Sequence, residues 1–201
     1  MSATFTFDDL RELGIPSRPQ GPLFSHPDHG LDTHNWHAYL SSRGRFEAGT
    51  TTLQKEAAHQ KLSLTHFACG NFVAGITRSC LALLRSELAA GRRKIPPKRI
   101  HRAHLFPRRD FTHYLLTGPL LTREEFLDLH WLTSVVVLCL KEENDRLESK
   151  AAFDELVLRV PNEIISDTAG DPSPMWFSTT PSSFSYGSRE RELISSLTLA
   201  P

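Results

Sequence analysis

The stretch TREEFLDLHWLTSVVVLCLKEENDRL, residues 122–147, contains the most extended apolar run of the chain and decides the predicted fold. Thr122 followed three residues later by Glu125 is a capping box, which marks the start of a helix. Apolar residues then recur at helical spacing, at Phe126, Leu129, Leu132, Val136 and Leu140. The valine triplet at 135–137 would also suit a strand. Because the pattern continues into the charged residues 141–145, we favour one long helix that ends near residue 147.

Upstream of this stretch, residues 65–90 predict a second long helix. Its apolar side chains follow the i, i+4, i+7, i+11 pattern of one helix face, at Cys69, Val73, Ile76, Cys80, Leu83 and Leu84. Gly70 and Gly75 inside such a helix each cost about 1 kcal/mol relative to alanine, so packing against a neighbour has to offset them. Gly91 is expected to end this helix. A further helix is predicted over residues 50–62, whereas the types of residues 110–116 and 151–160 stay open between helix and strand.

These elements predict a mostly α protein, with a helical bundle core over residues 33–160 and long irregular N- and C-terminal arms. The N-terminal arm, residues 1–32, starts with a short capped helix near residues 4–13 that ends at Gly14. In the C-terminal arm, residues 161–201, 15 of the 23 residues from 166 to 188 are Ser, Thr, Pro or Gly, which cannot form a core. Four aromatic residues interrupt this polar stretch and are the predicted partner-binding anchors: Trp176, Phe177, Phe184 and Tyr186.

The composition is that of an ordinary globular domain and excludes several classes of protein. Of the 201 residues, 39 % are hydrophobic and 23 % are charged, which excludes collagen, coiled coils and fully disordered chains. No apolar run reaches the 18 or so residues of a membrane span, and Asp8, Asp9 and Glu12 stand where a signal peptide would be basic and then apolar. The three cysteines are widely spaced and predict no disulfide framework. We therefore expect buried structural cysteines, a reducing intracellular compartment and no membrane partner.

Positive charge is concentrated in one segment, RRKIPPKRIHRAHLFPRR, residues 92–109, which has eight Lys or Arg and no acidic residue. The rest of the chain then holds 15 basic and 23 acidic residues, and such segregation is typical of a polyanion site. Prolines at 96, 97 and 107 are expected to keep the segment extended, so that its charges follow a phosphate backbone, while His104 and Phe106 stack on bases. If six to eight phosphates are contacted, log K should fall with log salt at a slope of roughly −4 to −7. The predicted nucleic-acid-binding residues are Arg92, Arg93, Lys94, Lys98, Arg99, Arg102, Arg108 and Arg109.

Other interpretations of the basic segment stay open. It could be a solvated loop, or it could pair with acidic helices of the same chain or with a partner protein. Arg108 and His113 form an R-x4-H pair that resembles the catalytic motif of HEPN-type helical ribonucleases. The resemblance implies RNA cleavage by 2′-hydroxyl attack, with Arg108 or Arg109 and His113 as the catalytic residues.

Four histidines lie close together in HPDHGLDTHNWH, residues 26–37, and are weak candidates for metal ligands: His26, His29, His34 and His37. Imidazole and carboxylate groups are suitable ligands for zinc and other transition metals. Their spacing matches no known metal site, so we favour a polar loop and predict no metal and no cofactor.

The sequence thus predicts a non-enzymatic nucleic-acid-binding or assembly protein, either a nucleoprotein or coat-like subunit or a regulatory adaptor. Glycine-rich phosphate loops, the G-x-S-x-G hydrolase motif and H-E-x-x-H are all missing from the sequence. Single-stranded RNA or DNA is favoured as the partner over duplex, because no helix-turn-helix, zinc-finger or RNP pattern occurs. A protein partner or self-assembly is also expected. The alternatives are a helical HEPN-like ribonuclease and a protein–protein adaptor that uses the C-terminal aromatics.

Overall fold

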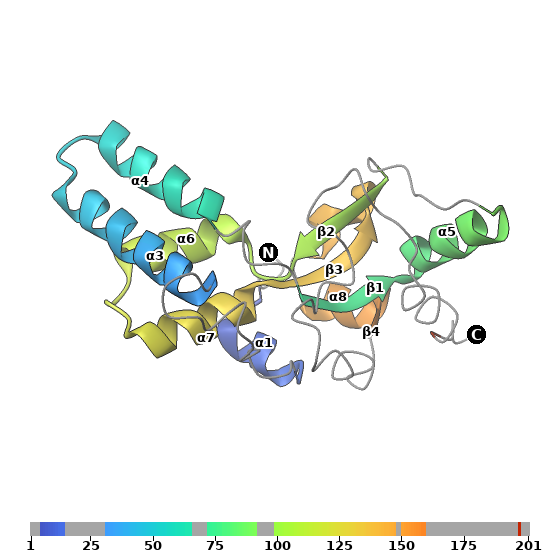
Figure 1. The fold of residues 1–201 in the computed structure, drawn as a ribbon. Coiled ribbons are helices and arrows are strands. Elements are labelled where there is room, and N and C mark those ends of the chain that lie inside the picture. Colours follow the sequence, from blue (N-terminus) through green and yellow to red (C-terminus); the bar gives the residue numbers. More distant parts are fainter. Residues whose placement is uncertain are drawn as a thin grey trace.

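The computed structural model describes residues 5–14, 31–65, 72–91, 99–147, 150–159 and 197 (Figure 1). Of these residues 67 % are helical, so the chain is mostly α as predicted, but four strands form a small mixed sheet. The elements in chain order are α1 (Phe7–Glu12), α3 (Leu31–Ala48), α4 (Thr52–Thr65), β1 (Phe72–Thr77), α5 (Arg78–Ala89), β2 (Ile100–His104), α6 (Arg108–Thr117), α7 (Arg123–Thr133), β3 (Val135–Leu140), the 3-10 helix η2 (Lys141–Arg146), α8 (Lys150–Leu156) and β4 (Val157–Arg159).

The sheet is built around β3. Its strand order is β2-β3-β1-β4, with β3 parallel to β1 and antiparallel to β2, and with β4 antiparallel to β1. The five residues from Val135 to Cys139 are all buried, so both faces of this strand are covered. A short run rich in valine, buried on both faces, is the usual composition of a central strand next to a parallel neighbour.

The long helix predicted over residues 122–147 is therefore wrong in its second half. The capping box is confirmed, because Thr122 Oγ1 accepts from the Glu125 amide at 3.3 Å and the Glu125 carboxylate accepts from the Thr122 amide at 2.8 Å. The helix that it starts, α7, ends at Thr133, and the valine triplet continues as β3. The strand form prevails because β3 pairs with a neighbour on each side, which a helix could not do.

The helix predicted over residues 65–90 is also wrong at residues 72–77, which form β1, and is confirmed at residues 78–89, which form α5. Residues 66–71 of this prediction lie outside the described residues. Gly75 shows why a strand is present. A Cβ atom at this position would lie 2.3 Å from Val157 Cγ1 and 2.9 Å from the Leu158 carbonyl oxygen on β4. Glycine here permits the close approach of two strands and is not a helical residue that packing has to offset.

Several local predictions are confirmed. A capping box between Thr6 and Asp9 starts α1, and Gly14 follows the helix with a φ of 67°. Gly91 follows α5 with a φ of 71°, the left-handed conformation that commonly ends helices. Residues 52–65 form α4, close to the helix predicted over residues 50–62. The structure decides the two segments whose type was open: residues 108–117 form the helix α6, and residues 150–159 form a helix followed by a strand.

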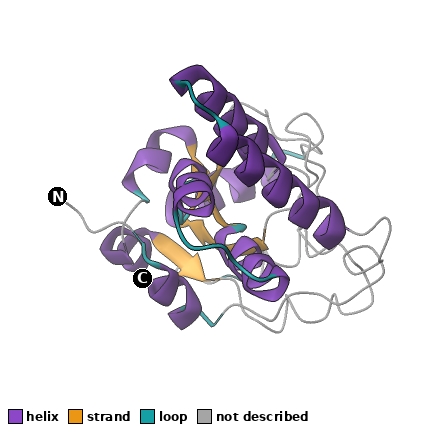
Figure 2. Cartoon of the chain, turned by 90° about the vertical axis from the view of Figure 1, so that its left-hand side faces the viewer, coloured by secondary structure: helices purple, strands orange, loops and turns teal. Residues whose placement is uncertain are grey.

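The helices α3, α4, α6 and α7, here called the helical lobe, lie at one end of the molecule, and the sheet with α5 and α8 lies at the other (Figure 1). Viewed from the helical end, the helices stand in front of the strands (Figure 2). Each part has its own apolar core, one around β3 and one around Tyr39, Phe111 and Phe126. Within the described ranges, no helix has the length and apolar character needed to cross a membrane.

Arg43 of α3 caps the C-terminus of α6 inside the helical lobe. Its guanidinium donates to the carbonyls of Leu115, Gly118 and Pro119 at 3.1, 2.9 and 2.9 Å. These carbonyls lie at and beyond the C-terminus of α6, where no further helical turn supplies a donor. An arginine from a neighbouring helix thus ties α3 to α6.

The helix α1 joins the two cores. Phe5 meets Phe153 of α8 edge to face, with ring centroids 5.9 Å apart. Phe7 stacks on Phe106 at 4.7 Å, at the entrance to α6. Because neighbouring residues of α1 and its lead-in contact different cores, this short helix fixes the helical lobe against the sheet.

Gly75→Ala is expected to lower the free energy of unfolding by about 1–3 kcal/mol, the usual cost of overpacking, because the new methyl group meets the β4 backbone. Gly44→Ala on α3 is the matched control. A Cβ atom at Gly44 would meet nothing within 4 Å beyond its chain neighbours and the backbone of its own helix, so this substitution should instead gain up to about 1 kcal/mol of helix propensity. Urea unfolding followed by circular dichroism measures both, and equal effects would contradict this account of Gly75.

Candidate functional site

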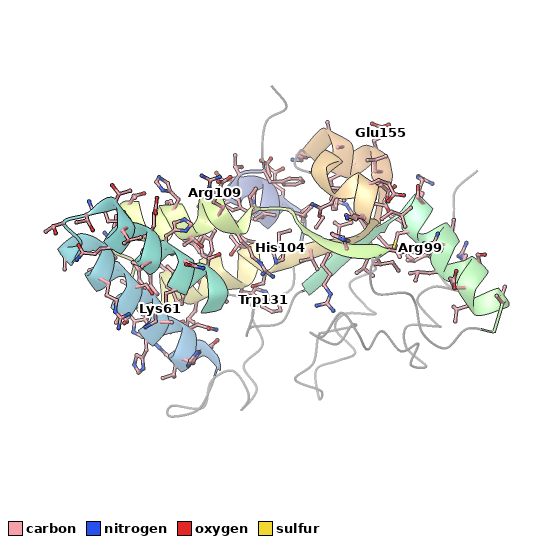
Figure 3. All side chains as sticks on the ribbon, turned by 90° about the horizontal axis from the view of Figure 1, so that it is seen from above. Lys61, Arg99, His104, Arg109, Trp131 and Glu155 are labelled. Carbon is pink, nitrogen blue, oxygen red and sulfur yellow. The ribbon has the colours of Figure 1, made fainter. Side chains whose placement is uncertain are left out.

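The described part of the basic segment, residues 99–109, forms the edge of the sheet and the start of a helix. Residues 92–98, with Arg92, Arg93, Lys94 and Lys98, lie outside the described residues. The predicted extended form is confirmed for β2, which pairs with β3 and has a free outer edge among the described strands. It is wrong for Arg108 and Arg109, which begin α6, because Pro107 with its φ of −57° suits a helix N-terminus. In Figure 3, Arg99 and His104 mark the two ends of β2, and Arg109 lies on α6.

The arginines of the described basic segment, residues 99–109, have different surroundings. Arg99 has a side chain that is 56 % exposed and forms an ion pair with the buried Glu87 of α5 at 3.7 Å. Pairing with the chain's own acidic residues, one of the open interpretations, therefore occurs at this position. Arg109 is exposed. Arg102 is half-buried, and burial lowers the pKa of its guanidinium below the ordinary value.

His104 and Arg108 form a directed pair. The Nε of Arg108 donates to the Nε2 of His104 at 2.9 Å. Burial, together with the positive charges of Arg108 and Arg102, lowers the pKa of His104 to about 3. A hydrogen bond to the backbone of Arg102 acts in the opposite direction and is the smaller effect. The ring is therefore neutral at neutral pH, and the two arginines create a positive potential around it.

A small hollow opens beside this pair, where β2, α6 and the α7–β3 junction meet. It has room for about one water-sized atom and is lined by His104, Arg108, Phe111, Thr133 and Ser134. The Ser134 hydroxyl donates to the His130 carbonyl at 2.7 Å, and the Thr133 hydroxyl donates to the Leu129 carbonyl at 2.9 Å. These five lining residues include one fixed cation and two hydroxyls, and none of them is a carboxylate.

His130 lies close to the hollow on α7 and is buried. Its ring contacts Phe126 and Phe111, with centroids 5.5 and 6.3 Å apart. Burial and the charge of Arg108 lower the pKa of His130 to about 4. Sequence reasoning did not find His130, Thr133 or Ser134 as site residues, because nothing in their local pattern indicates that they meet residues 104–111, which lie at least 19 residues earlier in the chain.

Other predicted site residues are not brought to this hollow. Arg108 and His113 are five residues apart on α6, roughly 140° around the helix, and His113 is exposed while Arg108 contacts His104. Arg109 and His113 are four residues apart and share an exposed face of α6. Phe106 stacks on Phe7, and His104 accepts a hydrogen bond from Arg108, so both rings already make contacts within the chain. Stacking of these rings on bases stays a prediction.

The metal and partner candidates are described only in part. His34 and His37 lie exposed on α3, while His26 and His29 lie outside the described residues. In the part of the chain that the structure describes, no three His, Cys, Asp or Glu side chains form a group that could hold a metal. The predicted anchors Trp176, Phe177, Phe184 and Tyr186 also lie outside it.

Cys80 and Cys139 are buried free thiols, as expected from their apolar neighbours. Burial raises the pKa of Cys80 well above its ordinary value and that of Cys139 to about 12, so neither is a thiolate at neutral pH. Cys69 lies outside the described residues.

Comparison of the chain with protein-family models, with curated proteins and with solved structures finds no match. The site therefore has to be interpreted from its own geometry.

His130→Phe is expected to flatten the dependence of stability on pH. The pKa of this histidine is about 4 in the folded protein and about 6.5 in an unfolded chain, so the unfolded state binds more protons between these values. Stability is fully present above pH 6.5 and is lost as the pH falls toward 4; the loss from pH 7.5 to pH 5 is about 2 kcal/mol.

The measurement is urea unfolding at pH 7.5 and at pH 5. The His130→Phe protein should lose about 2 kcal/mol less than the wild type between the two pH values. The exposed His113→Phe is the control and should keep the wild-type difference. An unchanged difference in His130→Phe would refute the assignment of a neutral, buried His130.

Proposed function

We propose that the chain binds single-stranded nucleic acid, RNA or DNA, along β2 and the first turn of α6. The observation that carries the proposal is the convergence of Arg102 and Arg108 on the neutral His104 of β2, the edge strand of the sheet that the structure describes. The more exposed Arg99 and Arg109 continue the same line of charge at either end (Figure 3).

Positive charge gathers around His104. Two guanidinium groups are close enough to lower the pKa of the same histidine, and one of them is itself partly removed from water. A local positive potential of this kind attracts anions. A phosphate backbone lying along β2 would meet this potential and release counterions as it binds.

A single strand suits this surface better than a duplex. The described basic residues of this segment lie on and beside an edge strand and in the first turn of α6, and not along one exposed face of a helix. An edge strand of five residues, about 17 Å long, offers instead a narrow, linear row of side chains. Its residues alternate between the two faces of the sheet, and four of the five side chains are only partly buried among the described residues.

We also propose a role in assembly, in which the N-terminal arm (residues 1–32) and the C-terminal arm (residues 161–201) contact a protein partner or another copy of the chain. No described residue bears on it. A HEPN-like ribonuclease would use Arg109 with His113, the pair that shares an exposed face of α6.

The double variant Arg102→Gln/Arg109→Gln should weaken binding of a labelled single-stranded oligonucleotide and reduce its salt dependence. Each lost phosphate contact removes about 0.7 from the slope of log K against log salt, so the slope should become shallower by about 1.4. Fluorescence anisotropy between 50 and 200 mM salt measures this for RNA and for DNA.

Arg45→Gln, an exposed arginine of α3 outside the basic segment, is the matched control and should keep the wild-type slope. Equal slopes for the control and the double variant would exclude this surface. The RNA is examined on a gel afterwards and should be intact. Cleavage that disappears in Arg109→Ala/His113→Ala would support the ribonuclease in place of the binding protein.

A further inference from the structure

We propose that the hollow between β2, α6 and the α7–β3 junction binds a terminal phosphate group, with Arg108 as its cation and His104 as the residue that positions Arg108. The inference deepens the proposed function and rests on it for the source of the phosphate, the end of a nucleic-acid strand.

Arg108 is held in one orientation by the rest of the site. Its Nε is directed to His104 Nε2 at 2.9 Å, which fixes the plane of the guanidinium, and the side chain lines the hollow. That planar fork matches the spacing of two phosphate oxygens. A side chain already fixed before binding loses less conformational freedom when the ligand arrives. His104 can hold Arg108 in this way because it is neutral and presents a lone pair.

The hydroxyls on the opposite wall can turn toward an anion. The His130 carbonyl accepts from Ser134 at 2.7 Å and also from Thr133 at 3.2 Å. Ser134 can redirect its hydrogen to a phosphate oxygen, since a hydroxyl rotates freely about its C–O bond. The His130 carbonyl then shares the single hydrogen of the Thr133 hydroxyl with the Leu129 carbonyl. Ser134 is itself 8 % exposed, so its alternative acceptor has to come from within the hollow.

The first turn of α6 borders the hollow through Arg108. Arg108 is the first residue of this ten-residue helix, and its N-cap, Pro107, gives no side-chain hydrogen bond. Asp110 is the acidic residue of this first turn and complements the positive end of the helix dipole. The preference of the hollow for negative charge therefore comes from the guanidinium of Arg108 and the two hydroxyls.

The size of the hollow favours the end of a strand over its interior. Room for about one water-sized atom admits one oxygen of a phosphate, with the others at the mouth beside Arg108. A terminal phosphate monoester carries close to two negative charges and three acceptor oxygens, whereas an internal diester carries one charge and is blocked on two sides. The monoester is therefore expected to bind in the hollow more tightly than an internal diester.

The test compares one oligonucleotide sequence with a 5′-phosphate, with a 3′-phosphate and with hydroxyls at both ends. One phosphorylated form should bind at least about tenfold more tightly than the hydroxyl form, the value of one charge-assisted hydrogen-bonded contact. Arg108→Gln should abolish this preference. Arg45→Gln, far from the hollow in sequence and on α3, should keep it.

His104 is tested by two replacements. His104→Gln keeps a side-chain oxygen that can accept from Arg108 Nε and should retain most of the preference, whereas His104→Leu should lose it. Thermal unfolding of each variant shows whether it is folded, and only folded variants are compared. Equal loss of binding for all three probes in His104→Leu would overturn its role as a positioning residue.

The outcomes separate this inference from the proposed function. Binding of all three probes with equal affinity, or a preference that survives Arg108→Gln, overturns the terminal-phosphate site and leaves strand binding in place. If no probe binds, the proposed function fails. Calorimetry with a nucleoside 5′-monophosphate then tests whether the hollow binds a terminal phosphate without a nucleic-acid strand. Binding that depends on Arg108 then supports the site, and no binding overturns it.

Discussion

The structure depends on the pairing of β3 with neighbours on both sides. Val135 to Cys139 are buried, so the strand contributes apolar side chains to both faces of the sheet while its backbone binds β1 and β2. The helix α7 runs into it through the single residue Ser134, and β2 leads into α6 through only three residues, 105–107. Such short connections leave little freedom, and the helical lobe is oriented by the strands from which it extends.

The candidate site lies where these two connections meet. His104 and Arg108 stand on either side of the connection from β2 to α6, and Thr133 and Ser134 form the junction of α7 with β3. A further tie comes from α1, where Phe7 stacks on Phe106 inside the first connection. The geometry of the hollow is therefore set by the same contacts that fix the two parts of the molecule to each other.

Part of this site could be predicted and part could not. Charge segregation identifies residues 92–109 from the sequence alone, because electrostatic character depends on composition and survives an error in secondary structure. Which arginine is exposed, which pairs with Glu87 and which is held by His104 depends on neighbours distant in the chain. His130 gives no signal beyond being a histidine in an apolar run, and its neutral state results from burial next to Arg108.

The sequence by itself determined the features whose physical cause is local. The capping box at Thr122 and the left-handed glycines at 14 and 91 involve hydrogen bonds and backbone conformations within a few residues, and each is found as predicted. Tertiary structure decided that residues 72–77 and 135–140 are strands, since a strand is stabilised by hydrogen bonds to segments that the local sequence does not contain. It also decided the site, because a hollow formed by the ends of three elements exists only once those elements are packed.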